Sequence, residues 1–163
     1  MATPASGLSL QAVRDYAERV GEKHNIYDES GHANVERLVH KLGGHVRVEA
    51  MPESLRVRDR GDFTIFVPLT TSERRDRFTI AHELGHYFLH YLFPGNTGAK
   101  SFGRGLSNRA ETEANTFASS LLMPAGAFKE AFAKYDQNVH MLASIFDVSV
   151  RAAEVRCSVL KLT

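Results

Sequence analysis

The fold and the chemistry of this chain centre on residues 78–90, which read FTIAHELGHYFLH. Within this stretch, His82, Glu83 and His86 form the pattern H-E-x-x-H. Residues four apart on a helix lie one above the other on the same face, so the two imidazoles can bind one zinc ion. Glu83 lies one residue further round, where its carboxylate can take a proton from a water on the metal. The stretch therefore predicts a helix with the local machinery of a zinc-dependent peptidase.

Length and composition predict a single cytoplasmic, soluble domain over residues 1–163. The chain is 43% hydrophobic and 24% charged, which is ordinary for a globular protein with one core. Its net charge of +1 gives no overall attraction to nucleic acid. A single cysteine, Cys157, allows no internal disulfide, which fits a reducing compartment. The sequence shows neither a signal-peptide pattern nor an apolar run long enough to span a membrane.

Hydrophobic periodicity predicts an α+β fold with a helical C-terminal half. The central helix is expected from about Thr71, where Thr70 and Glu73 have capping-box spacing, to about Phe93. Before it, helices are expected over residues 10–24, with Ser9 as cap, and over residues 33–42. Alternating residues predict a three-stranded sheet, packed on the central helix, from residues 45–50, 55–58 and 63–67. After it, we expect a mobile loop over residues 94–107 and helices over residues 108–123, 125–135, 138–146 and 149–161.

A catalytic zinc ion takes three protein ligands, so the two histidines need a partner from another element. His90 continues the i, i+4 series, but its Cα lies roughly 12 Å along the helix from that of His82. We expect His90 to pack or to form hydrogen bonds instead. Glu111 on the next helix is the favoured third ligand, because Asn115 shares its face and can hydrogen-bond the far ring nitrogen of a ligand histidine. Glu113 lies about 160° round that helix from Asn115 and is the alternative third ligand.

Three segments of the chain carry a resemblance to a known family. They read RFTIAHELGHYFLH at residues 77–90, ETEANTFA at residues 111–118 and LLMP at residues 121–124. In this order they resemble the ImmA/IrrE family of metallo-endopeptidases, as do the predicted strands and residues 142–149. The resemblance implies a gluzincin-like fold, zinc bound by His82, His86 and Glu111, and Glu83 as the base. It also implies that the substrate is a helix-turn-helix transcriptional repressor encoded nearby.

A second interpretation of the C-terminal region is DNA binding. Residues 142–159 have helix-turn-helix spacing, and the second helix carries Arg151, Arg156 and Lys161. However, Asp147 stands where that turn favours glycine, and this local excess of positive charge is small. Direct binding of nucleic acid is therefore the weaker interpretation of this segment.

A third interpretation is a regulatory protein that binds a metal without turnover. Such a protein would keep the three ligands but would not need Glu83, so the presence of Glu83 favours catalysis. For a catalytic protein, we expect one edge of the small sheet to line the cleft and to accept an extended segment of the substrate by strand addition. Residues 94–107 are the expected lid.

Overall fold

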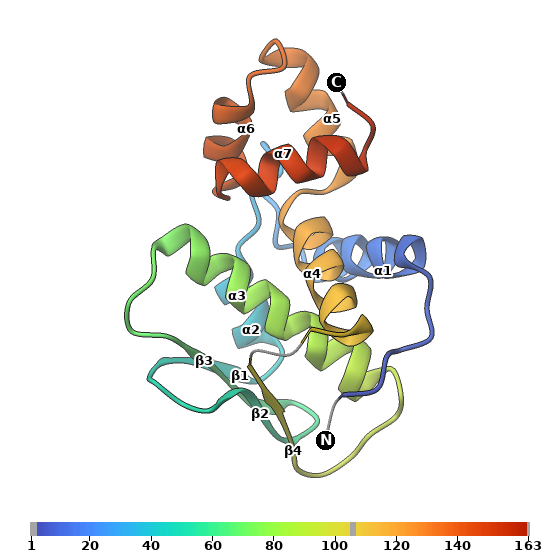
Figure 1. Ribbon diagram of the computed structural model, residues 1–163, viewed down its shortest axis with the longest axis vertical. Helices are drawn as coiled ribbons and strands as arrows, with labels where there is room; N and C mark the ends of the chain where they lie inside the picture. Colours follow the sequence, from blue (N-terminus) through green and yellow to red (C-terminus); the bar gives the residue numbers. More distant parts are fainter. Residues whose placement is uncertain (1–2, 105–106, 163) are drawn as a thin grey trace.

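The structure is a computed structural model that describes residues 3–104 and 107–162. Its helices are α1 (Leu10–Lys23), α2 (Val35–Lys41), α3 (Glu73–His86), the π-helix η1 (Tyr87–Leu92), α4 (Arg109–Leu122), α5 (Ala125–Lys134), α6 (Val139–Phe146) and α7 (Val150–Val159). Its strands are β1 (Gly44–Val48), β2 (Glu53–Asp59), β3 (Asp62–Val67) and β4 (Lys100–Gly103). Figure 1 shows the sheet at one end and α5, α6 and α7 at the other, with α3 and α4 between them. The predicted α+β fold is confirmed.

The sheet has four strands in the order β1-β3-β2-β4, and the prediction of three strands was wrong. β1 runs parallel to β3, and β2 runs antiparallel to both of its neighbours. The fourth strand lies within residues 94–107, where the sequence predicted only a loop because of its Gly, Ser and Asn content. Pairing outweighs local composition here: Arg56 of β2 stands opposite Ser101 of β4, and Phe102 is buried. Residues 105 and 106 of the predicted loop lie outside the described residues.

The sheet packs against the helix that carries H-E-x-x-H, as predicted. The ring of Phe63 on β3 stacks on Tyr87 with centroids 4.2 Å apart. The ring of Phe102 on β4 stacks on His86 at 5.3 Å. These aromatic contacts fix the position of β3 and β4 against the end of α3, so both the sheet and its outer strand lie close to the histidines.

The start of the central helix differs from the prediction. α3 begins at Glu73 with Ser72 as its N-cap, rather than near Thr71 with a cap at Thr70. The Ser72 hydroxyl accepts a hydrogen bond from the amide of Arg75, which satisfies one of the backbone donors that the first turn leaves without a partner. Serine is a stronger N-cap than threonine, which agrees with the position of Ser72 before the first residue of α3.

The end of the central helix matches the prediction in position but not in type. The helical segment runs to Leu92, with Phe93 as its C-cap, but beyond His86 it is a π-helix. A π-helix has i→i+5 hydrogen bonds and turns through a smaller angle per residue than an α-helix. The direction in which His90 projects is therefore set by η1 and not by α-helical geometry.

A buried arginine joins the C-terminal helices to α3. The Arg77 guanidinium donates hydrogen bonds to the carbonyls of Ala33 at 3.0 Å, Asp147 at 3.2 Å and Phe146 at 3.4 Å. The Asp147 carboxylate lies 3.4 Å from both Arg74 and Arg77. Asp147 also ends α6 in the left-handed conformation, with φ 53°. The predicted turn between α6 and α7 is thus held against α3 by one aspartate.

Replacing Asp147 with asparagine should lower the free energy of unfolding by about 1–3 kcal/mol. Asparagine tolerates the left-handed conformation, so the substitution removes only the negative charge beside Arg77, whose side chain is 10% exposed. Asp136 offers a matched control, because it has the same φ of 53° and an exposed side chain. Asp136→Asn should change the stability by less than about 0.5 kcal/mol. Urea unfolding measures both variants, and equal losses would contradict this role for Asp147.

Candidate metal centre and cleft

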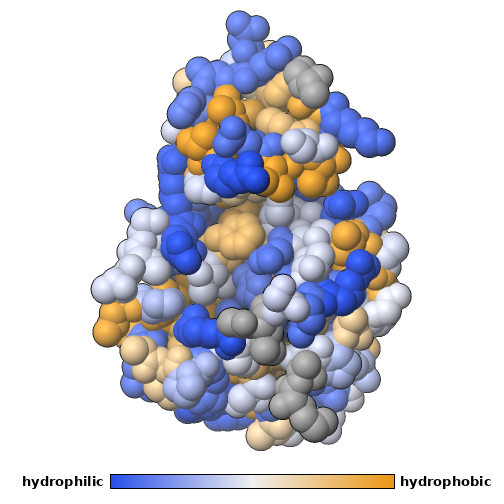
Figure 2. Space-filling view, in the orientation of Figure 1, coloured by the Kyte–Doolittle hydropathy of each residue, from blue (hydrophilic) through white to orange (hydrophobic). Residues whose placement is uncertain are grey.

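A cleft of about 1080 Å³ lies between α3, α4, α7 and the end of the sheet. Figure 2 shows it as the hollow near the middle of the molecule, below the C-terminal helices. His82 and Glu83 of α3, Ser54 of β2 and Glu111 of α4 all line this cleft. His82, Glu83 and Glu111, which the sequence analysis assigned to one site, therefore share one solvent-accessible space.

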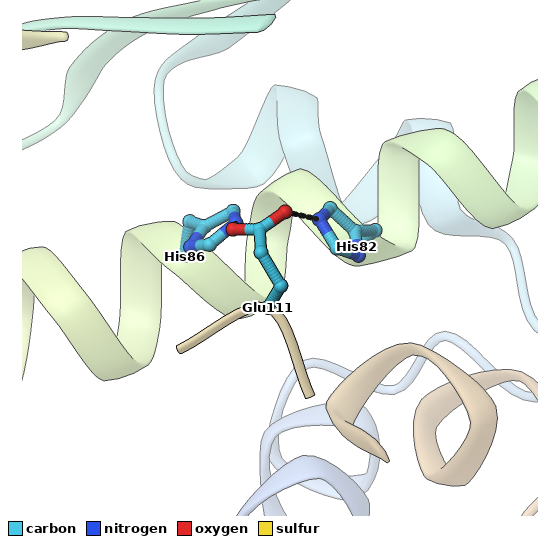
Figure 3. Close-up of side chains that lie close together, drawn as sticks. All are labelled: His82, His86 and Glu111. Atoms are coloured by element: carbon cyan, nitrogen blue, oxygen red, sulfur yellow. Dashed lines mark hydrogen bonds and ion pairs between the residues drawn. The ribbon is translucent and has the colours of Figure 1, made fainter. Parts of the chain in front are cut away.

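The three residues predicted to bind metal converge beside this cleft (Figure 3). His82 and His86 project from one face of α3, and Glu111 reaches them from the first turn of α4. Glu111 Oε1 lies 3.2 Å from His82 Nε2, and Glu111 Oε2 lies 2.7 Å from His86 Nε2. The possible ligand atoms of the three side chains all lie within 4.8 Å of one another, close enough to surround a single ion.

Two local features bring Glu111 to the histidines. Gly85 lets α4 cross α3 closely, because a Cβ at this position would lie 3.1 Å from both Ala114 Cα and Phe117 Cβ. Asn108 caps α4 by accepting a hydrogen bond from the Glu111 amide at 3.0 Å. The close packing of α3 and α4 therefore explains the glycine at position 85, since a larger residue would push apart the two helices that carry the possible ligands.

The chemistry of these side chains fits a zinc ion. Burial opposes the ionisation of Glu111, but close contacts with the imidazoles of His82 and His86 hold the pKa of this carboxyl well below its usual range. Burial lowers the pKa of His86 and so favours its neutral imidazole. His86 Nε2 is buried and makes no well-aligned hydrogen bond, although Glu111 Oε2 lies nearby. Neutral imidazole and ionised carboxylate are the forms in which these residues bind zinc.

The other ring nitrogen of each histidine has a partner. His82 Nδ1 lies 2.7 Å from Asn115 Oδ1, which is the contact predicted for this asparagine. His86 Nδ1 lies 2.8 Å from His90 Nδ1. His90 therefore takes part in a hydrogen bond and not in the cluster of possible ligands, in agreement with the prediction. Such partners orient metal-binding imidazoles and select their tautomer.

Glu113, the alternative third ligand, points away from the histidine pair and toward His90. Its Oε1 lies 2.8 Å from His90 Nε2, and its side chain is fully buried. It also accepts hydrogen bonds from the Ser6 amide at 2.9 Å and the Ser6 hydroxyl at 2.8 Å. A chain of contacts thus runs from the N-terminal segment through Glu113 and His90 to His86.

Glu83 is buried beside the three possible ligands. The residue is only 4% exposed, and its Oε1 accepts a hydrogen bond from the Ser54 hydroxyl at 3.0 Å. Burial raises the pKa of Glu83 to about 7. A carboxyl group with a pKa near neutrality can both accept and return a proton, as a general base requires.

Ser6 and Ser54 were missed by the sequence analysis. Ser6 is 107 residues from Glu113 in the chain, and nothing in its neighbourhood marks it as a partner of a buried acid. Ser54 is 2% exposed on β2, but a lone serine in a strand has no spacing signal. Only the fold brings these hydroxyls to the two glutamates.

In the metal-free protein, Glu83 should reduce stability as the pH rises. Its folded-state pKa of about 7 exceeds the ordinary value of 4.5 that applies in the unfolded chain. The folded state therefore binds more protons between these two values, and stability falls from about pH 4.5 to above pH 7. Glu83→Gln should match the original protein near pH 4 and be more stable by roughly 3 kcal/mol at pH 8. Urea unfolding in a chelator across this range tests it; a pH-independent difference would contradict it.

Two histidines from one helix, a glutamate from a second helix and a buried glutamate beside them form the arrangement found in metallopeptidases. Residues 40–158 match the family described as Peptidase_M78, IrrE N-terminal-like domain, and the chain belongs to this family. The family membership predicted from the sequence is confirmed, and with it a peptidase-type function. No curated protein matches the chain. Across residues 3–104 and 107–162, none of the helices is long and apolar enough to cross a membrane.

Proposed function

We propose that the protein is a zinc-dependent endopeptidase in which His82, His86 and Glu111 bind the zinc ion and Glu83 is the general base. The observation that carries the proposal is the convergence of these side chains in one cleft, with the possible ligand atoms within 4.8 Å of one another. The family match supports a peptidase. Two histidines and one carboxylate leave one coordination position open, as hydrolysis requires.

Each side chain has a defined task in this proposal. Zinc, when bound, would polarise the scissile carbonyl and lower the pKa of a water molecule. Glu83 takes the proton from the attacking water and delivers it to the amine that leaves. Ser54 orients the Glu83 carboxylate through its hydroxyl. Asn115 holds the His82 ring in place through a contact with its Nδ1 atom, and His90 holds the His86 ring in the same way.

We further propose that the substrate segment binds as an extended strand beside β4. This strand is at the edge of the sheet, and Gly103 at its end lines the cleft. An edge strand offers backbone N–H and C=O groups to a partner segment, so binding is mostly main-chain and suits an exposed, flexible stretch. The family resemblance suggests a helix-turn-helix repressor encoded nearby as the partner.

Incubation of the purified protein with that repressor, with and without a chelator, tests the proposed function. We expect cleavage at one or a few sites, loss of cleavage in the chelator, and its return when zinc is added. Casein serves as a control and should be cut slowly, because the site needs an exposed segment with matching side chains. Unchanged cleavage in the chelator would contradict the metal-dependent mechanism, and rapid digestion of casein would contradict the selectivity.

The side chains of α7 and of the turn before it support DNA binding less well than the metal site supports a peptidase. Arg156, one of the three cations on the second helix, is buried and donates to the Met123 carbonyl at 3.0 Å. It is therefore unable to reach a phosphate group. The turn residue Asp147 pairs with α3, and its carboxylate would repel a nearby phosphate backbone.

A further inference from the structure

The cleft that contains the candidate metal site has a local excess of positive charge. Among its described lining residues, the only acids are Glu83 and Glu111, and both belong to that site. The arginines that line it are Arg14, Arg74, Arg75, Arg104, Arg151 and Arg156. Since the whole chain has a net charge of +1, this excess is a property of the cleft and not of the molecule.

Two of these arginines are best placed to meet a ligand. The other four already have partners. Arg156 donates a hydrogen bond to the Met123 carbonyl, and Arg74 lies 3.4 Å from the Asp147 carboxylate. Arg104 donates to the Phe66 carbonyl, and Arg14 donates to the Gln11 side chain. Arg75 in the first turn of α3 and Arg151 in the first turn of α7 are both exposed. Neither forms an ion pair with another residue of the described chain. Their guanidinium groups can therefore bind an anionic group without breaking an existing pair.

One wall of the same cleft is apolar. Ala152, Val155 and Val159 of α7 have the i, i+3, i+7 spacing of a single helical face, and they line the cleft together with Val148, which precedes the helix. Val155 and Val159 are each 40% exposed, so they offer apolar surface to the cleft. Phe78 of α3 lines the cleft as well. Figure 2 shows apolar side chains of the C-terminal helices bordering the hollow.

We infer that this cleft selects a substrate segment that carries both acidic and apolar side chains. The carboxylates would pair with Arg75 and Arg151, and the apolar side chains would pack on Val155, Val159 and Phe78. Charge complementarity fixes the orientation of the segment, and apolar contact supplies affinity. The inference rests on the proposed peptidase function, for which it names the class of sequence that is held beside the metal site.

The apolar wall favours a peptide over a nucleic acid. Proteins that bind single-stranded nucleic acid combine cations with aromatic rings on which the bases stack. The wall formed by α7 offers valine and alanine, which cannot stack on bases. Among the described residues that line the cleft, Phe78 is the only Phe, Tyr or Trp, and the His82 ring belongs to the candidate metal site. Aliphatic side chains next to arginines match a segment in which Leu or Ile alternates with Asp or Glu.

A binding experiment with two matched peptides tests this inference. Both are fluorescent 12-residue peptides with the same apolar residues, and they carry either Glu or Lys at the same remaining positions. The zinc-loaded full chain with Glu83→Gln serves as receptor, so that binding is measured by anisotropy without turnover. We expect the acidic peptide to bind at least about tenfold more tightly, with a preference that shrinks at high salt.

Charge reversal on the receptor provides the control. Arg75→Glu combined with Arg151→Glu should abolish or invert the preference. Arg19→Glu combined with Arg37→Glu makes the same change in net charge at exposed residues that do not line the cleft, and it should preserve the preference. Val155→Ser combined with Val159→Ser should weaken the binding of both peptides several-fold without changing the ratio of their affinities.

Three results would overturn the inference. They are equal binding of the two peptides, equal effects of the two pairs of arginine reversals, and tighter binding of a 12-nucleotide single-stranded DNA that displaces the acidic peptide. The inference and the proposed function can fail separately. If the acidic peptide binds selectively but the original protein cuts neither peptide, the peptidase proposal fails; if both are cut equally fast, only the selectivity fails.

Discussion

Replacing Glu83 with glutamine should reduce cleavage of a protein substrate by about 10²–10⁴-fold while the protein still binds zinc. Glutamine has nearly the same shape and can still accept the Ser54 hydrogen bond at its carbonyl oxygen, so the cleft should keep its structure. It cannot accept a proton from water. The loss should therefore appear in kcat, with little change in KM. Initial rates with the original protein and the variant, at equal zinc content, measure the effect.

The same variant separates a peptidase from a non-catalytic metal-binding protein. Glu130→Gln, on the exposed side of α5, makes the same chemical change away from the cleft and should keep full activity. If Glu83→Gln cleaves as fast as this control, Glu83 is not the base. If the original protein binds zinc but cleaves nothing, the regulatory interpretation becomes the better one.

The parts of the fold that the sequence predicted are those with a local cause. Ser9 accepts a hydrogen bond from the Ala12 amide and caps α1, as the pattern indicated. His82 and His86 face one way because four residues are about one turn of helix. Glu111 and Asn115 share a face of α4 for the same reason, and both contact His82. Short-range periodicity therefore predicts which side chains share a helix face, and the packing of α4 on α3 brings the two faces together.

The features that the sequence did not predict depend on contacts between distant segments. β4 has only four residues and forms because β2 offers it an edge, with Val57 opposite Lys100. The change from α-helix to π-helix after His86 was not predicted, because hydrophobic periodicity and helix propensity indicate a helix without distinguishing the two types. Arg77 would be interpreted as a surface residue because it ends the charged run at residues 73–77. It is buried because Ala33 and Phe146 bring their carbonyls to it.

A comparison of Glu111 with Glu113 should show two different effects on metal binding. Glu111→Ala should remove a ligand, so zinc should be lost on dialysis against a weak chelator that the original protein withstands. Glu113→Gln should keep zinc but weaken its affinity by about 10–100-fold. The physical reason is that Glu113 holds His90, which in turn holds His86, so its charge acts on the ligand through two contacts.

Competition with a chromophoric chelator measures the affinities, and metal analysis gives the stoichiometry. Glu113 is fully buried, so its substitution also risks a loss of stability that would imitate weak binding. Ser6→Ala provides the milder test, because it removes one hydrogen bond to Glu113 and leaves the contact with His90 in place. It should weaken zinc binding less than Glu113→Gln does, and it should also lower the unfolding temperature of the metal-free protein by less. Retention of zinc by Glu111→Ala, together with its loss in Glu113→Ala, would show that Glu113 is the third ligand.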